Sequence, residues 1–84
     1  MNSKHKKTHE AIFADPVLAN IPWDDIDALL VALGAFRQEG NGSRTRYLLN
    51  GVPAVFHRPH PRRETDRGAV KSVRKFLIDA GEMP

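Results

Sequence analysis

The dipeptide Asn50-Gly51 constrains the fold of this chain more than any other feature of its sequence. Asparagine and glycine tolerate positive φ, so the pair suits a type I′ turn, which joins two antiparallel strands through two residues. The runs on either side, residues 44–49 and 52–57, are extended in character and carry apolar side chains. The sequence therefore predicts a β-hairpin over residues 44–57, in which Pro53 lies where no ladder hydrogen bond is needed.

Two helices, each with one apolar face, are predicted before and after the strands. The first begins near Pro22, because proline suits a first helical turn and Asp24-Asp25 complement the positive end of the helix dipole, and it ends at Gly34. The second spans residues 67–80 and ends at Gly81. Apolar residues recur at helical spacing in both, and these stripes are expected to face the core: Trp23, Ile26, Leu29, Leu30 and Leu33, then Ala69, Val70, Val73, Phe76, Leu77 and Ala80.

A third short strand is predicted over residues 35–40, with Phe36 facing the core and a turn at residues 40–43 leading into the hairpin. The resulting order predicts an α+β fold of two layers, in which a three-stranded antiparallel sheet packs on two helices. This α-β-β-β-α order is that of the double-stranded-RNA-binding domain. Domains of that kind recognise the shape of the RNA helix, largely through contacts to phosphates and 2′-hydroxyl groups.

The N-terminal part of the chain is expected to add little to that sandwich. Residues 1–7 are polar and basic, and we expect them to be disordered, so that residues 8–84 form a single domain. Residues 8–14 predict a short extra helix, capped by Thr8 and stopped by Asp15-Pro16.

Basic charge is concentrated in the second half of the chain. Residues 44–75 contain nine lysines and arginines and only two acidic residues, whereas residues 8–43 are net acidic. The formal net charge of +3 hides this asymmetry, which ordinary surface lysines and arginines do not explain. A basic half on a small domain predicts a polyanionic partner, most simply nucleic acid. With 84 residues the chain has room for one modest core, so the site is expected to be a surface or a shallow groove.

Several classes of protein are disfavoured by what the sequence lacks. There is no cysteine, so neither a disulfide framework nor a thiolate metal site is expected. No apolar run approaches the length of a membrane span, and no apolar stretch follows the basic N-terminus as in a signal peptide. His57 and His60 lack a third metal ligand nearby. We therefore expect a cytoplasmic protein with no membrane segment, no metal and no small-molecule cofactor.

Four stretches of the chain resemble the HicA family of bacterial toxins, which are small mRNA-cleaving proteins with this fold. The resemblance extends over about residues 22–82, and the Gly42-Ser43 turn and the final helix led by Gly68 are its more specific parts. It implies the toxin component of a type II toxin–antitoxin system, an mRNA-cleaving endoribonuclease held inactive by a HicB-type antitoxin that covers its basic face. The four stretches are residues 29–40, 42–44, 56–61 and 68–81.

Arg44 departs from the family pattern, in which the residue after Gly-Ser is commonly the catalytic histidine. Arginine keeps its proton near neutral pH and therefore cannot act as a general base. Two interpretations remain open: either the chain has lost cleavage and only binds RNA or its antitoxin, or the catalytic groups are redistributed. A third interpretation is a structural or regulatory subunit whose basic face serves protein contacts only.

Redistributed chemistry has candidate residues in the hairpin and in the loop after it. Metal-free RNA cleavage needs a base for the 2′-hydroxyl, an acid for the 5′-oxygen and positive charge near the phosphorus. His57 and His60 are the candidate catalytic residues, because imidazole titrates near neutral pH. Arg44 and Arg46 share one strand face and can clamp a phosphate, whereas Tyr47 lies on the opposite face and packs. The other candidate RNA-binding residues are Arg58, Arg62, Arg63 and Lys71.

Overall fold

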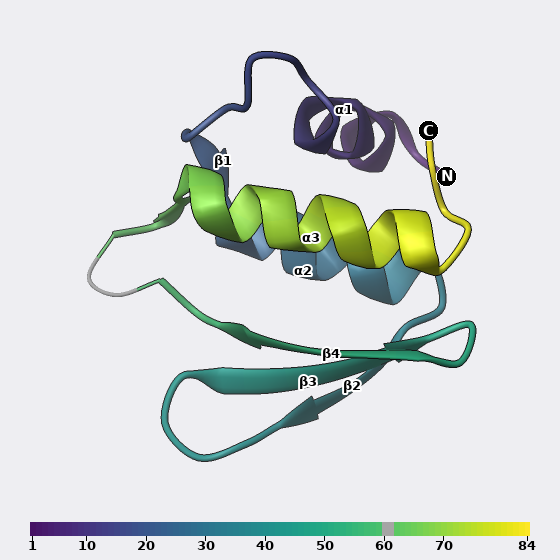
Figure 1. The fold of residues 1–84 in the computed structure, drawn as a ribbon, viewed down its shortest axis with the longest axis vertical. Coiled ribbons are helices and arrows are strands. Elements are labelled where there is room, and N and C mark those ends of the chain that lie inside the picture. The colour runs from purple at the N-terminus through teal and green to yellow at the C-terminus, as the bar shows by residue number, and fades with distance from the viewer. Residues whose placement is uncertain (60–61) are drawn as a thin grey trace.

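A three-stranded antiparallel sheet forms one side of the molecule, and two helices cover one of its faces (Figure 1). The computed structural model describes residues 1–59 and 62–84. The strands are β2 (Phe36–Glu39), β3 (Arg44–Leu49) and β4 (Val52–His57), in the spatial order β2-β3-β4. The covering helices are α2 (Trp23–Ala32) and α3 (Arg67–Asp79). This is the predicted α+β arrangement, in the element order of the double-stranded-RNA-binding domain.

The hairpin between β3 and β4 forms as predicted. Asn50 and Gly51 have φ angles of 51° and 83°, which is the left-handed conformation that a type I′ turn requires. Leu49 pairs with Val52 across the turn, and the register continues residue by residue to the far end of both strands. Pro53 lies in β4, which is an edge strand, so the missing amide proton costs no bond to a neighbour on its open side.

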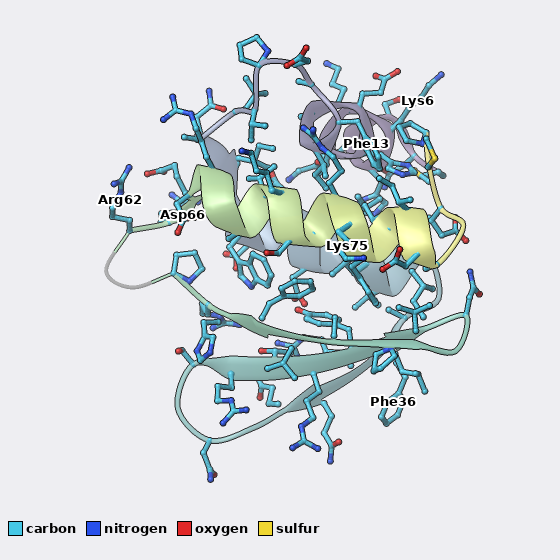
Figure 2. The ribbon with its side chains drawn as sticks, in the orientation of Figure 1. Lys6, Phe13, Phe36, Arg62, Asp66 and Lys75 are labelled. Carbon is cyan, nitrogen blue, oxygen red and sulfur yellow. The ribbon has the colours of Figure 1, made fainter. Side chains whose placement is uncertain are left out.

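Strand β2 presents its side chains the opposite way to the prediction. The sequence predicts that Phe36 faces the core, and this prediction is wrong: its side chain is 66% exposed and points away from the helices (Figure 2). The inward position of β2 belongs to Arg37, whose Nε donates a hydrogen bond to Asp27 of α2 at 2.9 Å. Because side chains alternate along a strand, placing Arg37 inward places Phe36 outward, and the preceding Ala35 fills the core instead.

The core lies between the sheet and helices α2 and α3, and aromatic rings form its centre. The ring of Phe56 lies 5.8 Å, centroid to centroid, from each of Trp23, Tyr47 and Phe76. Trp23 is buried, as expected for a core residue. The final helix keeps its predicted ends, with Asp66 as its N-cap and Gly81 at positive φ just beyond it.

Helix α1 (Ser3–Ile12) begins earlier than the sequence predicts. The side chain of Asn2 accepts a hydrogen bond from the backbone N–H of His5 at 2.8 Å, so Asn2, and not Thr8, caps the helix. Residues 3–7 are therefore helical, and the prediction that they are disordered is wrong. The extra N-terminal helix itself is confirmed, and it forms a further layer on the side of α2 and α3 that faces away from the sheet (Figure 1).

Arg74 of α3 fastens the end of this added helix. Its guanidinium donates hydrogen bonds to the backbone carbonyls of Ile12 at 3.0 Å and Ala14 at 2.9 Å. The carbonyl of Ile12, the last residue of α1, has no partner within the helix, so the first bond satisfies a group that would otherwise need water, and the second holds the chain just beyond the helix end. The ring of Phe13 also lies beneath the guanidinium, 5.8 Å from it.

A small second sheet holds residues 63–65, which precede α3, against the chain that leads into α2. Strand β1 (Ile21–Pro22) pairs antiparallel with β5 (Glu64–Thr65), and the backbone N–H of Trp23 donates to the carbonyl of Arg63 at 2.9 Å. The sequence predicts only a loop over residues 58–66, because strands of two residues are too short to show alternation. The pairing holds the end of that loop against the start of α2. No helix in the described ranges is long and apolar enough to cross a membrane.

Candidate nucleic-acid interface

Arg44 and His57 lie directly opposite each other on neighbouring strands. They are cross-strand partners in the β3–β4 register, and both side chains are exposed on the sheet face that turns away from the helices. The backbone N–H of Arg58 donates to the carbonyl of Ser43 at 2.8 Å, which makes the adjacent pair, Arg44 and His57, a non-hydrogen-bonded pair. Opposing side chains come closest in such pairs. The hairpin therefore brings an imidazole and a guanidinium together at the end of the sheet.

Arg46 extends the basic row along the same face. The side chains of β3 alternate, with Arg44 and Arg46 exposed and Thr45 and Tyr47 buried between and beside them. The predicted shared face of the two arginines and the inward packing of Tyr47 are both confirmed. Whether the arginines bind RNA stays a prediction.

Arg44 borders two shallow hollows at the turn between β2 and β3. One, of about 220 Å³, is lined by Gln38, Glu39, Gly40, Asn41, Arg44 and Arg46. The other, of about 130 Å³, is lined by Glu39, Gly40, Gly42, Ser43, Arg44, Thr45 and Arg58. Gly42 has a φ of 66°, which is the left-handed backbone conformation. Glycine adopts it without the steric cost that a side chain would bring, so the turn beside these hollows favours glycine at this position. The site is a shallow surface, as the length of the chain predicts.

Three of the other candidate arginines gather beside the first turn of α2. Arg58, Arg62 and Arg63 line a hollow of about 180 Å³ together with residues 22–24 and Pro59. Arg58 also lines the smaller hollow beside Arg44, so it lies between the two groups. An extended anion following these hollows would meet a guanidinium at each of them.

The remaining two candidates fall outside this arrangement. Lys71 is exposed on α3 and borders none of the three hollows just described. His60 lies outside the described residues, so its catalytic role stays a prediction.

The family to which these features belong follows from comparison with known proteins. The family model described as "HicA toxin of bacterial toxin-antitoxin" matches residues 23–81, which include the sheet and both covering helices. The chain belongs to the HicA toxin family. It is therefore the toxin component of a toxin–antitoxin system, and a cognate antitoxin is its partner. No curated protein and no solved structure matches the chain.

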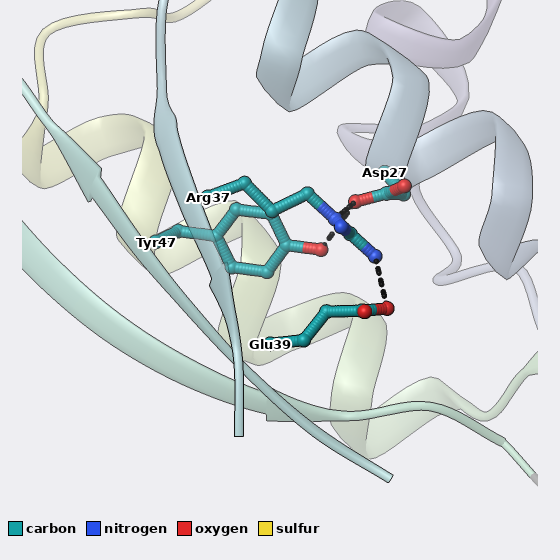
Figure 3. Close-up of polar contacts among 4 residues, drawn as sticks. All are labelled: Asp27, Arg37, Glu39 and Tyr47. Carbon is teal, nitrogen blue, oxygen red and sulfur yellow. Dashed lines mark hydrogen bonds and ion pairs between the residues drawn. The ribbon is translucent and has the colours of Figure 1, made fainter.

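A polar cluster on the inner side of the HicA sheet joins β2 and β3 to α2 (Figure 3). The carboxylate of Asp27 accepts hydrogen bonds from Arg37 at 2.9 Å and from the Tyr47 hydroxyl at 2.5 Å. Burial, reinforced by the hydrogen bond to the Asp27 carboxylate, raises the pKa of Tyr47 well above its usual value. Tyr47 is therefore a permanent donor near neutral pH and braces the sheet, rather than acting as a base.

Glu39 lies between the Asp27–Arg37–Tyr47 cluster and the basic surface formed by Arg44 and Arg46. It was not among the site residues predicted from the sequence. Its carboxylate accepts a hydrogen bond from Arg37 at 3.1 Å, and the residue lines both hollows that Arg44 borders. The alternation of side chains along β2 could have indicated this contact, because Glu39 lies two residues from Arg37 and therefore on the same face of the strand. Within residues 1–59 and 62–84, no group of three or more His, Asp or Glu side chains is placed to hold a metal ion.

Proposed function

We propose that this HicA-family toxin binds mRNA at the Arg44 end of its sheet and cleaves it as a metal-independent endoribonuclease, and that a HicB-type antitoxin neutralises it. The observation that carries the proposal is the cross-strand pair of Arg44 and His57 on one exposed face. The family resemblance implies a catalytic histidine at the position of Arg44. His57 supplies an imidazole from the neighbouring strand, directly beside that position.

In the proposed reaction each residue has a role that suits its chemistry. His57 accepts the proton of a ribose 2′-hydroxyl, and the 2′-oxygen then attacks the adjacent phosphorus. The phosphorus–5′-oxygen bond breaks, and a second group, for which His60 is the candidate, returns a proton to the leaving 5′-oxygen. Arg44 and Arg46 stabilise the negative charge that grows on the phosphoryl oxygens.

A second candidate function is a binding module without cleavage, and Arg44 itself favours it. A guanidinium is permanently protonated, so it retains affinity for phosphate while lacking the ability to take a proton. Under this alternative the basic surface holds RNA or the antitoxin, and His57 only borders the site. A structural subunit that makes protein contacts alone predicts no RNA affinity at all.

Growth arrest on induced expression, followed together with mRNA integrity, separates these functions. The wild type would be compared with His57→Ala, His60→Ala and Arg44→Ala. His5→Ala is the matched control, because it removes an imidazole from α1 on the other side of the molecule. The proposed nuclease predicts growth arrest with loss of mRNA in the wild type and in the control, and loss of both effects in His57→Ala.

Two other results would replace the proposal. If the wild type leaves mRNA intact but binds RNA with an affinity that falls steeply as salt rises, the binding module is the correct function. If purified wild-type protein shows no RNA affinity at low salt, the basic surface serves protein contacts only.

A further inference from the structure

An exposed aromatic ring lies on the outer face of the sheet, in line with the arginines. Phe36 is 66% exposed and extends away from the helices (Figure 2). Leu48 pairs with Phe36 on one side and with Pro53 on the other, so these three residues form an apolar row across the strands. The row borders a hollow of about 380 Å³. A contiguous apolar group around a hollow marks an interaction surface.

The next row along the same face is mostly polar. Gln38 pairs with Arg46, which pairs in turn with Val55, and all three line the same hollow. The cross-strand pair of Arg44 and His57 forms the row after that. Successive rows lie two residues apart, or about 7 Å, because a strand rises about 3.4 Å per residue. An aromatic ring, an amide, a guanidinium and the proposed cleavage pair therefore follow one another along one face.

The charges of this face indicate the kind of ligand. The outward residues of the three strands include no carboxylate: Phe36, Gln38, Arg44, Arg46, Leu48, Pro53, Val55 and His57. A second copy of the chain would therefore place arginines against arginines with no acid between them. A nucleotide complements the face better, because it joins a flat apolar base with a polar edge to an anionic phosphate. An RNA strand bound at Arg44 meets Arg46 and then Phe36 as it continues along the sheet.

We propose that the hollow beside Phe36 is a subsite for one base of single-stranded RNA, which stacks on the Phe36 ring with its polar edge towards Gln38 and its phosphate against Arg46. Stacking on exposed aromatic side chains is the usual way in which proteins bind unpaired bases. A base within a duplex has both faces covered by its neighbours, so it cannot enter this subsite. The inference rests on the proposed function for RNA binding at the Arg44 end, but it does not need cleavage.

The position of the subsite assigns it a role in selecting the RNA. Phe36 lies two rows, or about 13 Å, from the row of Arg44 and His57. The stacked base therefore belongs to a nucleotide that flanks the bond to be cleaved. The amide of Gln38 has both a donor and an acceptor, and the edges of the bases differ in their pattern of donors and acceptors. Gln38 is therefore the residue that distinguishes one base from another.

The test separates the base from the phosphates. Affinity would be measured by fluorescence anisotropy for a short 2′-O-methyl RNA, which lacks the 2′-hydroxyl needed for cleavage, and for the same oligomer with abasic residues. The wild type should bind the complete oligomer roughly fivefold or more tightly than the abasic one, which is the lower end of the effect of stacking one base. Phe36→Leu keeps an apolar side chain but should lose this difference, whereas Phe36→Tyr keeps an aromatic ring and should retain it.

Two further comparisons act as controls. Val31→Ser removes an apolar side chain that is 49% exposed on α2, and its affinity for the complete oligomer should stay within about twofold of the wild type. Every Phe36 variant should bind the abasic oligomer as the wild type does, because the arginines remain. Among oligoadenylate, oligouridylate and oligocytidylate of equal length, the wild type should show a preference that Gln38→Ala reduces.

The outcomes distinguish failure of the subsite from failure of the proposed function. A wild type that binds no oligomer at low salt would overturn both. Equal affinity of the wild type for the complete and the abasic oligomer would overturn the subsite alone, because the arginines would still hold the RNA backbone. An equal loss on both oligomers in Phe36→Leu would mean that Phe36 acts through the fold, and would also overturn the subsite. Unchanged RNA affinity in Phe36→Leu, together with weaker binding of the antitoxin, would assign the apolar row to protein contacts instead.

Discussion

Replacing Tyr47 by phenylalanine would remove one hydroxyl from the joint between the sheet and α2 (Figure 3). The hydroxyl donates to Asp27 at 2.5 Å, and a hydrogen bond to a charged acceptor contributes about 1.5–3 kcal/mol to stability. Asp27 keeps its bond to Arg37 and is 23% exposed, so water can replace part of the loss. We therefore expect Tyr47→Phe to cost about 1.5 kcal/mol, near the lower end of that range. In a domain of this size the loss lowers Tm by roughly 6–12 °C.

The pH dependence of the same variant checks the cause. The pKa of Tyr47 is raised in the folded protein, so its stabilising contribution is complete below the pKa of an unfolded tyrosine, about 10, and is lost as pH rises above that value. Phenylalanine does not titrate. The difference in unfolding free energy between wild type and Tyr47→Phe should therefore be constant near neutral pH and shrink above about pH 10.

Urea denaturation at several pH values measures this difference directly. Ser72→Ala is the matched control, because it also removes a hydroxyl, in this case one that donates to the carbonyl of Gly68 on the surface of α3. The control should change stability by less than about 0.5 kcal/mol. A Tyr47→Phe cost as small as that of Ser72→Ala, or a cost that does not change up to about pH 11, would refute the brace assigned to Tyr47.

Two further predictions concern the basic surface and the added helix. Arg46→Ala should weaken RNA binding and reduce the slope of log affinity against log salt by about 0.7, as measured by fluorescence anisotropy, whereas Lys6→Ala on α1 should leave the slope unchanged. Ile12→Ala should lower the unfolding free energy by about 2–5 kcal/mol in urea denaturation, because Ile12 is fully buried although it precedes the matched family region. If Ile12→Ala costs no more than the exposed Val31→Ala, α1 does not belong to the cooperative core.

The parts of the fold that could be predicted are those with local signals. The turn at Asn50-Gly51 fixes the hairpin, and counting outward from it pairs Leu49 with Val52 and, at the far end of the strands, Arg44 with His57. Helix ends at Gly34 and Gly81 follow from the same kind of local signal, since both residues have positive φ. The proximity of Arg44 and His57 can therefore be predicted from the sequence.

The parts that could not be predicted depend on contacts distant in sequence. The apolar character of Phe36 favours a place in the core, but the orientation of β2 is set by the bond between Arg37 and Asp27. The sequence of this four-residue strand does not indicate a hydrogen bond to a helix residue ten positions earlier. The same reversal places Phe36 beside Leu48 on the exposed face of the sheet, which the sequence does not predict. Glu39 is a different case, because the alternation of β2 already places it on the same face as Arg37, two residues away.

The alternation of β3 separates folding from function within one strand. Thr45 and Tyr47 are buried and hold the sheet to the helices, whereas Arg44 and Arg46 are exposed and lie outside the core. Substitutions at the outward positions should therefore change binding while leaving stability nearly intact. This separation is what makes the proposed function testable, since a loss of activity in Arg44→Ala or His57→Ala cannot then be explained by unfolding.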